Sequence, residues 1–104
     1  MQPGHKLRKL ANMYGLRVHR YSDQCDGRRF ARVALFLEED KSNAYPVVSC
    51  SDSGHFGNLS SYLSYCSHKA LLEFERLEEN QKLLAKIKGI KARVLANNRQ
   101  QNHR

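Results

Sequence analysis

Residues Phe30–Glu39 read FARVALFLEE, and this segment decides the fold. Apolar side chains alternate along it with a period of two, which is typical of a β-strand. One side of the predicted strand carries Ala31, Val33, Leu35 and Leu37, and the other carries Phe30, Ala34 and Phe36. Because both sides are apolar, we expect a strand inside a sheet that is at least partly covered on both faces.

The residues before this strand predict a hairpin and a helix. The segment LRVHRY (Leu16–Tyr21) reads as a first strand, and Asp26-Gly27 is the expected tip of the turn that follows it. Upstream, HKLRKLANMY (His5–Tyr14) places its apolar residues at helical spacing. Gly15 stands where a helix C-cap is expected, so a short N-terminal helix is predicted.

The residues after the strand predict a third strand and a long helix. AYPVVSC (Ala44–Cys50) reads as a strand, and Pro46 places it at the sheet edge because proline cannot donate a ladder hydrogen bond. Residues 59–97 carry apolar residues at steps of three and four, with Asn58 or Ser60 as the expected N-cap. Residues 98–104 are polar and predict a disordered tail.

Together these elements predict a single α+β domain over residues 1–97. It comprises a short N-terminal helix, a three-stranded, mostly antiparallel sheet and a long C-terminal helix. No run of about eighteen apolar residues is present, which excludes a membrane span, and the N-terminus lacks the apolar core of a signal peptide. Three cysteines at wide spacing favour reduced thiols and a cytoplasmic protein.

Charge is distributed unevenly along the 104 residues, whose net charge is +8. Residues 1–36 carry eight Lys or Arg against two Asp, residues 37–80 carry three against eight acidic groups, and residues 81–104 carry seven against none. Two basic ends therefore flank an acidic middle. Such a surplus is typical of proteins that contact a polyanion, either nucleic acid or an acidic protein surface.

The basic residues gather in the first helix, near the hairpin and along the last helix. Arg17, His19 and Tyr21 share one side of the first strand, where a phosphate could sit beside a stacking aromatic ring. The sequence predicts a small non-catalytic nucleic-acid-binding protein acting through phosphate contacts. Its candidate binding residues are Lys6, Arg8, Lys9, Arg17, Arg28, Arg29, Arg32, Lys82, Lys86 and Arg93.

An apolar stripe on the last helix supports an alternative function. The stripe is turned away from the apolar side of the helix's first half, so we expect the second half to leave the domain and meet a partner. The partner would be a second copy of the chain, giving a homodimer, or another protein that this one inhibits or tethers. The stripe consists of Leu83, Ile87, Ile90 and Val94.

Catalytic and metal chemistry find little support in the sequence. Cys50, His55, Cys66 and His68 could in principle ligate zinc, but structural zinc sites usually contain a Cys-x2–4-Cys knuckle, which is missing here. No glycine-rich elbow surrounds a cysteine, and no phosphate-binding loop is present. We therefore expect no enzyme activity, no metal and no cofactor.

The predicted order of helix, three strands and helix resembles the double-stranded RNA-binding domain. LRKLANMYGLRVHRY followed by RRFARVALFL is similar in pattern to that family's first half, and the resemblance covers about residues 5–50. It implies binding to the A-form duplex. The family's Lys-Lys-x-Ala-Lys cluster at the start of its last helix has no counterpart in SDSGHFGNLSSY, which contains no Lys or Arg.

Overall fold

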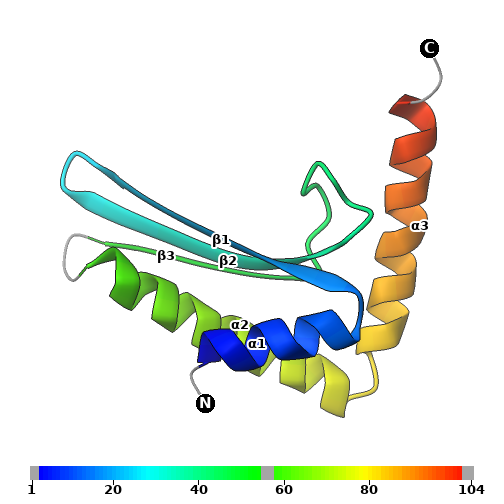
Figure 1. Ribbon diagram of the computed structural model, residues 1–104, viewed down its shortest axis with the longest axis horizontal. Helices are drawn as coiled ribbons and strands as arrows, with labels where there is room; N and C mark the ends of the chain where they lie inside the picture. Colours follow the sequence, from blue (N-terminus) through cyan, green and yellow to red (C-terminus); the bar gives the residue numbers. More distant parts are fainter. Residues whose placement is uncertain (1–2, 55–57, 102–104) are drawn as a thin grey trace.

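A computed structural model describes residues 3–54 and 58–101. It confirms the α+β class, with a short N-terminal helix, an antiparallel three-stranded sheet and a long helical C-terminal region (Figure 1). The elements in chain order are α1 (Pro3–Met13), β1 (Leu16–Cys25), β2 (Arg28–Leu37), β3 (Val48–Gly54), α2 (Leu59–Glu79) and α3 (Leu83–Gln101).

The sheet is a meander in the order β1-β2-β3, with β2 in the centre. Cys25 pairs with Arg28, so the β1–β2 loop has two residues, and both have positive φ: Asp26 at 52° and Gly27 at 78°. These angles fit the mirror-image turn that matches the twist of a hairpin, as the Asp-Gly pair predicts. β3 lies at the sheet edge, but it begins at Val48, so Pro46 precedes the strand and does not belong to it.

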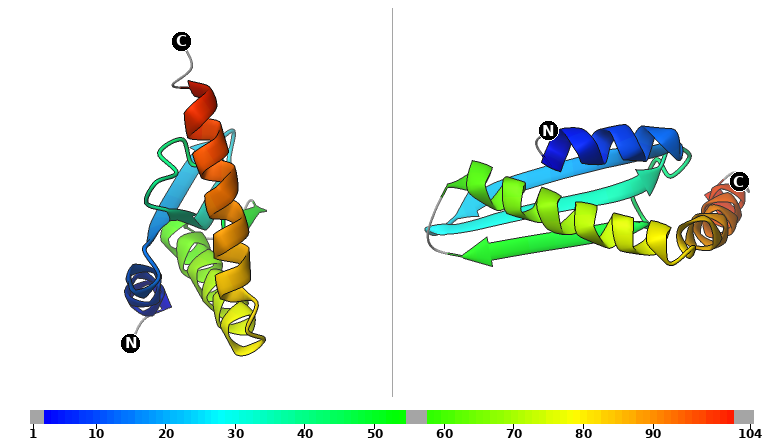
Figure 2. Two further views of the ribbon diagram at one scale, coloured as in Figure 1. Left: turned by 90° about the vertical axis from the view of Figure 1, so that its right-hand side faces the viewer. Right: turned by 90° about the horizontal axis from the view of Figure 1, so that it is seen from below.

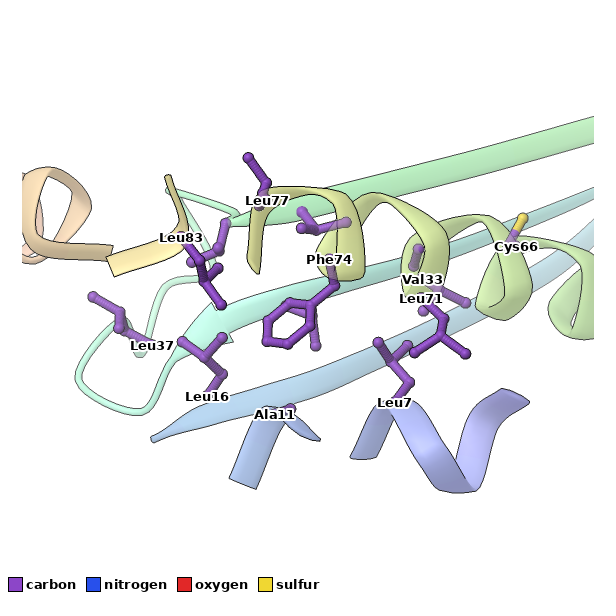
Figure 3. Packing of buried hydrophobic residues seen from close by; sticks show 14 of the residues in the cluster. Leu7, Ala11, Leu16, Val33, Leu37, Cys66, Leu71, Phe74, Leu77 and Leu83 are labelled. Carbon is purple, nitrogen blue, oxygen red and sulfur yellow. The ribbon is translucent and has the colours of Figure 1, made fainter. Parts of the chain in front are cut away.

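Helices α1 and α2 lie on one face of the sheet and leave the other face without a helix above it (Figures 1 and 2). The hydrophobic core fills the space between these helices and the sheet. Phe74 of α2 points from the helix toward the sheet, and Leu7 and Ala11 of α1 close the core from the side (Figure 3). Apolar burial on this face is the main term that holds the layers together.

The ends of the covering helices follow the expected local signals. Gly15, with φ 71°, follows α1, and its N–H donates to the carbonyl of Asn12 at 3.2 Å. Such a left-handed residue ends a helix at little steric cost only when it is glycine. At the start of α2, the side chain of Asn58 accepts a hydrogen bond from Ser61 N at 2.8 Å, which confirms Asn58 as the N-cap.

The helix expected over residues 59–97 is divided in two. Gln81 adopts φ 58°, and Lys82 N donates to the carbonyl of Leu77 at 2.9 Å, a bond pattern that terminates α2. The acidic end of α2 and the basic α3 are therefore separate helices, and α3 turns across the end of the sheet (Figure 1). α3 continues to Gln101, so the predicted polar tail is helical over residues 98–101 and its remainder, 102–104, lies outside the described residues.

A well-ordered loop, residues 38–47, connects β2 to β3 and lies beside α3 (Figure 1). Its centre is the buried Asp40, whose carboxylate accepts hydrogen bonds from Ala44 N at 3.1 Å and Tyr45 N at 2.8 Å. These two bonds supply the partners that a buried carboxylate requires. On the other side of the loop, Lys91 of α3 approaches Glu39 at 3.7 Å, so the loop separates α3 from the end of the sheet.

Over the two described ranges, no helix has both the length and the apolar character needed to cross a membrane.

Candidate nucleic-acid interface

The sheet face without a helix, here named the open face, is built from alternate residues of the three strands. Residues directly opposite each other in an antiparallel pair point to the same side, so the register assigns them. On β2, the open-face residues are those that alternate with the core residues. Their directly paired partners on β1 and β3 point to the same side of the sheet. The resulting set is Arg17, His19, Tyr21, Asp23 and Cys25 from β1, Arg28, Phe30, Arg32, Ala34 and Phe36 from β2, and Ser49, Ser51 and Ser53 from β3.

Phe36 is the last β2 residue of this set, opposite Arg17, and it is fully buried on the face that α1 and α2 leave uncovered. The guanidinium carbons of Arg17 and Arg32 each lie 5.8 Å from the ring centroid, and the ring of His19 meets it edge-on at 5.9 Å. Cations over an aromatic face are attracted by its quadrupole. The expectation that β2 is covered on both faces is thus met by side chains on one face and by helices on the other.

Arg17 is committed to the loop 38–47. Its guanidinium donates to the carbonyl oxygens of Leu37 at 3.3 Å and Asp40 at 3.0 Å, and to the side-chain oxygen of Asn43. A guanidinium has five N–H donors, and this arrangement directs them into the protein. Arg17 therefore connects β1 to the loop, and its main role is structural.

Arg32 is held more loosely than Arg17. Its Nε donates to the hydroxyl of Ser49 at 3.2 Å, and no other hydrogen bond or ion pair of its guanidinium is formed with the described residues. The single anchor orients the planar group above the sheet. A guanidinium in this position leaves its remaining donors available for a phosphate oxygen or a base edge.

Beyond Arg32, toward the hairpin, the open face carries an exposed aromatic pair. Tyr21 and Phe30 are 45% and 39% exposed, and their rings meet edge-on with centroids 6.0 Å apart. The hydroxyl of Tyr21 donates to the carboxylate of Asp23 at 3.1 Å, and this bond raises the pKa of the phenol. Aromatic rings that remain exposed on a sheet surface are suited to stacking with unpaired bases.

The ten predicted binding residues do not form one surface. Lys6, Arg8 and Lys9 belong to α1, on the far side of the sheet, and Lys6 is engaged with Glu75 at 3.4 Å. Arg29 points toward the helix side, because it alternates with the open-face residues Phe30 and Arg28. The open face contains three of the ten, Arg17, Arg28 and Arg32. α3 carries two more, Lys86 and Arg93, and Lys82 lies in the turn just before α3.

The apolar stripe of α3 packs within the chain. Leu83 and Val94 are buried in the hydrophobic core cluster, and Ile87 and Ile90 pack against it while partly buried. The expectation that the stripe has no target in the domain is therefore wrong. This packing could not be predicted from the periodicity of the sequence, because Tyr45, which also packs against this cluster and lines one hollow with Ile90, belongs to a loop without a regular pattern.

Burial disfavours Cys50 and Cys66 as nucleophiles, whereas Cys25 is exposed. Cys66 is fully buried and its sulfur donates to the carbonyl of Ala31 at 3.7 Å, and Cys50 is half-buried on β3. Burial raises the pKa of both thiols, so they stay protonated at neutral pH. Within residues 3–54 and 58–101, no three His, Cys, Asp or Glu side chains gather as metal ligands; His55 of the hypothetical zinc set lies outside these ranges.

Sequence reasoning missed Phe30, Phe36 and the three serines of β3 as parts of a surface. The signal was present in the period-two alternation of FARVALFLEE, but apolar residues on a strand normally indicate a covering layer. The predicted order of helix, three strands and helix is confirmed from α1 to α2, and α3 follows as a further helix. No protein-family model matches the chain, and no curated protein or solved structure shows significant similarity to it.

Proposed function

We propose that this protein is a non-catalytic nucleic-acid-binding protein that holds a single strand on the open face of its sheet. The observation that carries the proposal is the exposed Tyr21–Phe30 pair next to Arg28 and Arg32. Aromatic rings accept any base by stacking, and the adjacent guanidinium groups are matched to phosphate oxygens. The open face combines both kinds of contact on two neighbouring strands.

A single strand suits the open face better than a duplex. Bases must be unpaired to stack on side chains, and a broad sheet does not enter the deep, narrow major groove of A-form RNA. The basic residues of α1 lie on the other side of the sheet, so they cannot contact the same segment of a strand. This geometry differs from the duplex binding that the resemblance of the sequence implies.

The decisive experiment is fluorescence anisotropy with labelled single-stranded DNA and RNA, with duplexes of the same sequences for comparison. Tyr21→Ala with Phe30→Ala should weaken binding at least tenfold, because stacking contributes about 1–3 kcal/mol per base. Tyr65→Ala is the matched control, since Tyr65 is equally exposed but belongs to α2. Equal affinities of all three proteins would exclude the open face.

The electrostatic part of the proposal is tested by charge reversal. Arg28→Glu with Arg32→Glu should reduce affinity and flatten its salt dependence between roughly 50 and 200 mM salt, because fewer counterions are released on binding. Lys88→Glu with Arg99→Glu changes the net charge equally on the exposed side of α3 and serves as the control. If both pairs reduce affinity alike, the attraction is general and does not belong to the open face.

An interaction module remains the second candidate function, and exposed leucines on α3 favour it. Leu84 and Leu95 are exposed, and eleven residues separate them, which places them on the same side of the helix. This side differs from the buried stripe, and a second copy of the chain is the partner it predicts. Analytical ultracentrifugation should show dimers that Leu84→Ser with Leu95→Ser dissociates; a wild-type monomer at high concentration would exclude this function.

A further inference from the structure

We propose a second binding site, separate from the open face: a groove along the free edge of β3 that takes up an extended acidic peptide. The groove has a volume of about 550 Å³. Its floor is formed by Val48, Ser49 and Cys50 of β3, and its far wall is formed by α2. It shares Ser49 with the open face and none of that face's aromatic or basic side chains, so variants of those side chains test the two sites separately.

The floor of the groove offers backbone hydrogen bonds. β3 pairs with β2 on one side, and no described strand pairs with it on the other. An edge strand presents unpaired N–H and C=O groups, and an extended peptide can add to it as a further strand. Nucleic acid has no repeating amide backbone that could complete such a ladder. The edge therefore favours a polypeptide as the occupant.

The walls of the groove select for negative charge. Lys69 and Arg76 of α2 and Lys86 of α3 line it, and Glu73 is its single lining carboxylate. Glu73 is neutralised locally by Arg76, whose Nε and a terminal nitrogen lie 3.1 and 2.7 Å from its two oxygens. The hydrogen bond from Arg76 lowers the pKa of Glu73, so this ion pair persists near neutral pH and leaves two cations in surplus.

The groove continues along α3. A second hollow, of about 470 Å³, shares Pro46 and Lys86 with the groove and adds Arg93 to its lining. Lys86 of α3 therefore lines both hollows. Lys69, Lys86 and Arg93 form a row of cations that begins beside the unpaired strand and continues along α3, which is the charge complement of an acidic segment.

The α2 wall also contains an apolar contact. Leu72 is 53% exposed and lies between Lys69 and Arg76 in the helix sequence. Its spacing from them, three and four residues, places all three on one side of α2. Every second side chain of an extended peptide points to the same side, so a peptide whose α2-facing positions read Glu, Val and Glu would offer carboxylates to the cations and an apolar side chain to Leu72.

The test uses a labelled, capped peptide that matches the seven residues of β3 in length, with Glu, Val and Glu at its second, fourth and sixth positions and Thr at the others. Anisotropy should show saturable binding to the intact protein, and backbone amide shifts in the NMR spectrum should concentrate at Val48–Cys50. Two matched probes identify the chemistry: one replaces every Glu by Lys, and the other carries N-methyl groups on alternate amides. Both should bind at least tenfold more weakly, since one loses charge complementarity and the other loses the ladder.

Variants locate the site on the protein. The double variant Lys69→Glu with Lys86→Glu should bind the acidic peptide at least tenfold more weakly than the wild type. The control variant Lys88→Glu with Arg99→Glu should lose far less affinity. Leu72→Ser should weaken it several-fold, and because Leu72 is exposed this variant keeps its fold, as circular dichroism can verify. Tyr21→Ala with Phe30→Ala should leave peptide binding unchanged.

Four outcomes of the peptide experiments, and a fifth with an oligonucleotide, would overturn the proposal. They are the lack of saturable binding up to roughly 1 mM peptide, equal affinity for the Lys-containing probe, equal affinity for the N-methylated probe, and equal effects of the two charge-reversal pairs. Displacement of the peptide by a single-stranded oligonucleotide that itself shifts the Val48–Cys50 amides would assign the groove to nucleic acid, and would also overturn it.

Discussion

The two faces of the sheet bury a phenylalanine to the same extent by different means. Phe74 and Phe36 are both 0% exposed. Phe74 lies between α2 and the sheet and meets Tyr14 edge-on at 5.5 Å, whereas Phe36 is covered by two guanidinium groups and an imidazole. A buried residue therefore does not require an apolar layer above it. Charged side chains can exclude water from a ring and keep their polar ends in solvent.

This difference has a functional consequence. The helix-covered face cannot open without loss of the core, but the cover of the open face consists of side chains that rotate individually. Of the two guanidinium groups, Arg17 is fixed by the loop and Arg32 is anchored by one hydrogen bond to Ser49. Four predictions, ordered by expected size, test this contrast.

The largest effect is expected from truncating the two rings. Phe74→Ala should reduce the free energy of unfolding by about 3–5 kcal/mol, as measured by urea denaturation. Phe36→Ala should cost less, about 2 kcal/mol, because the side chains of the cover can collapse into the space. If both substitutions cost the same, the cover is as rigid as the core and the contrast between the faces fails.

The next effect concerns the residue that fixes the cover. Arg17→Met keeps a similar volume over Phe36 but removes the hydrogen bonds to the loop, and it should cost about 2 kcal/mol of stability. Hydrogen exchange should become faster in the loop 38–47 and in α3, which packs beside it. Arg32→Met is the control and should cost well under half as much. A larger loss for Arg32→Met would contradict the assigned roles.

A smaller effect is expected at the hairpin tip, where β1 and β2 meet. Gly27→Ala forces a Cβ atom into a residue with φ 78° and should cost about 1–2 kcal/mol. Since the Tyr21–Phe30 pair lies near this end of the strands, oligonucleotide binding should also weaken. Thermal unfolding measures this loss of stability. An unchanged unfolding temperature would show that the turn has changed to another type.

The smallest effect belongs to the helix-covered face alone. Asn58→Ala removes the side-chain cap of α2 and should cost about 1 kcal/mol. Oligonucleotide affinity should stay within error of the wild type, because α2 does not contribute to the open face. Asn58→Ser is the conservative control and should retain most of the stability. If the folded Asn58→Ala variant bound the oligonucleotide more weakly than the wild type, the two faces of the sheet would not act independently.

Local chemistry explains which parts of the fold could be predicted. Asp26-Gly27, Gly15 and Asn58 each act through backbone geometry within a few residues, so the sequence alone locates the first two and limits the N-cap to Asn58 or Ser60. The end of α2 could not be located in this way. Gln81 takes a left-handed conformation that glycine or asparagine normally supplies, while Gly89, the residue that predicts a weak point, lies inside α3.

The candidate surface could be predicted only in part, because it depends on contacts between distant residues. Arg17 was expected to contact a ligand, but 20 to 26 residues separate it from the loop groups that it binds. The stripe of α3 was expected to be free for the same reason, since its contacts include Tyr45. Sequence periodicity shows that a face is apolar and leaves open what it packs against.

The turn at Gln81 also makes the two ends of the open face different. Because α3 departs from α2 there, α3 and the loop 38–47 rise past one end of the sheet, and the hairpin tip leaves the opposite end clear (Figures 1 and 2). A polymer lying along the strands would be blocked at one end and could continue past the other. Under the proposed function, such a platform would bind the end of a strand more readily than its interior.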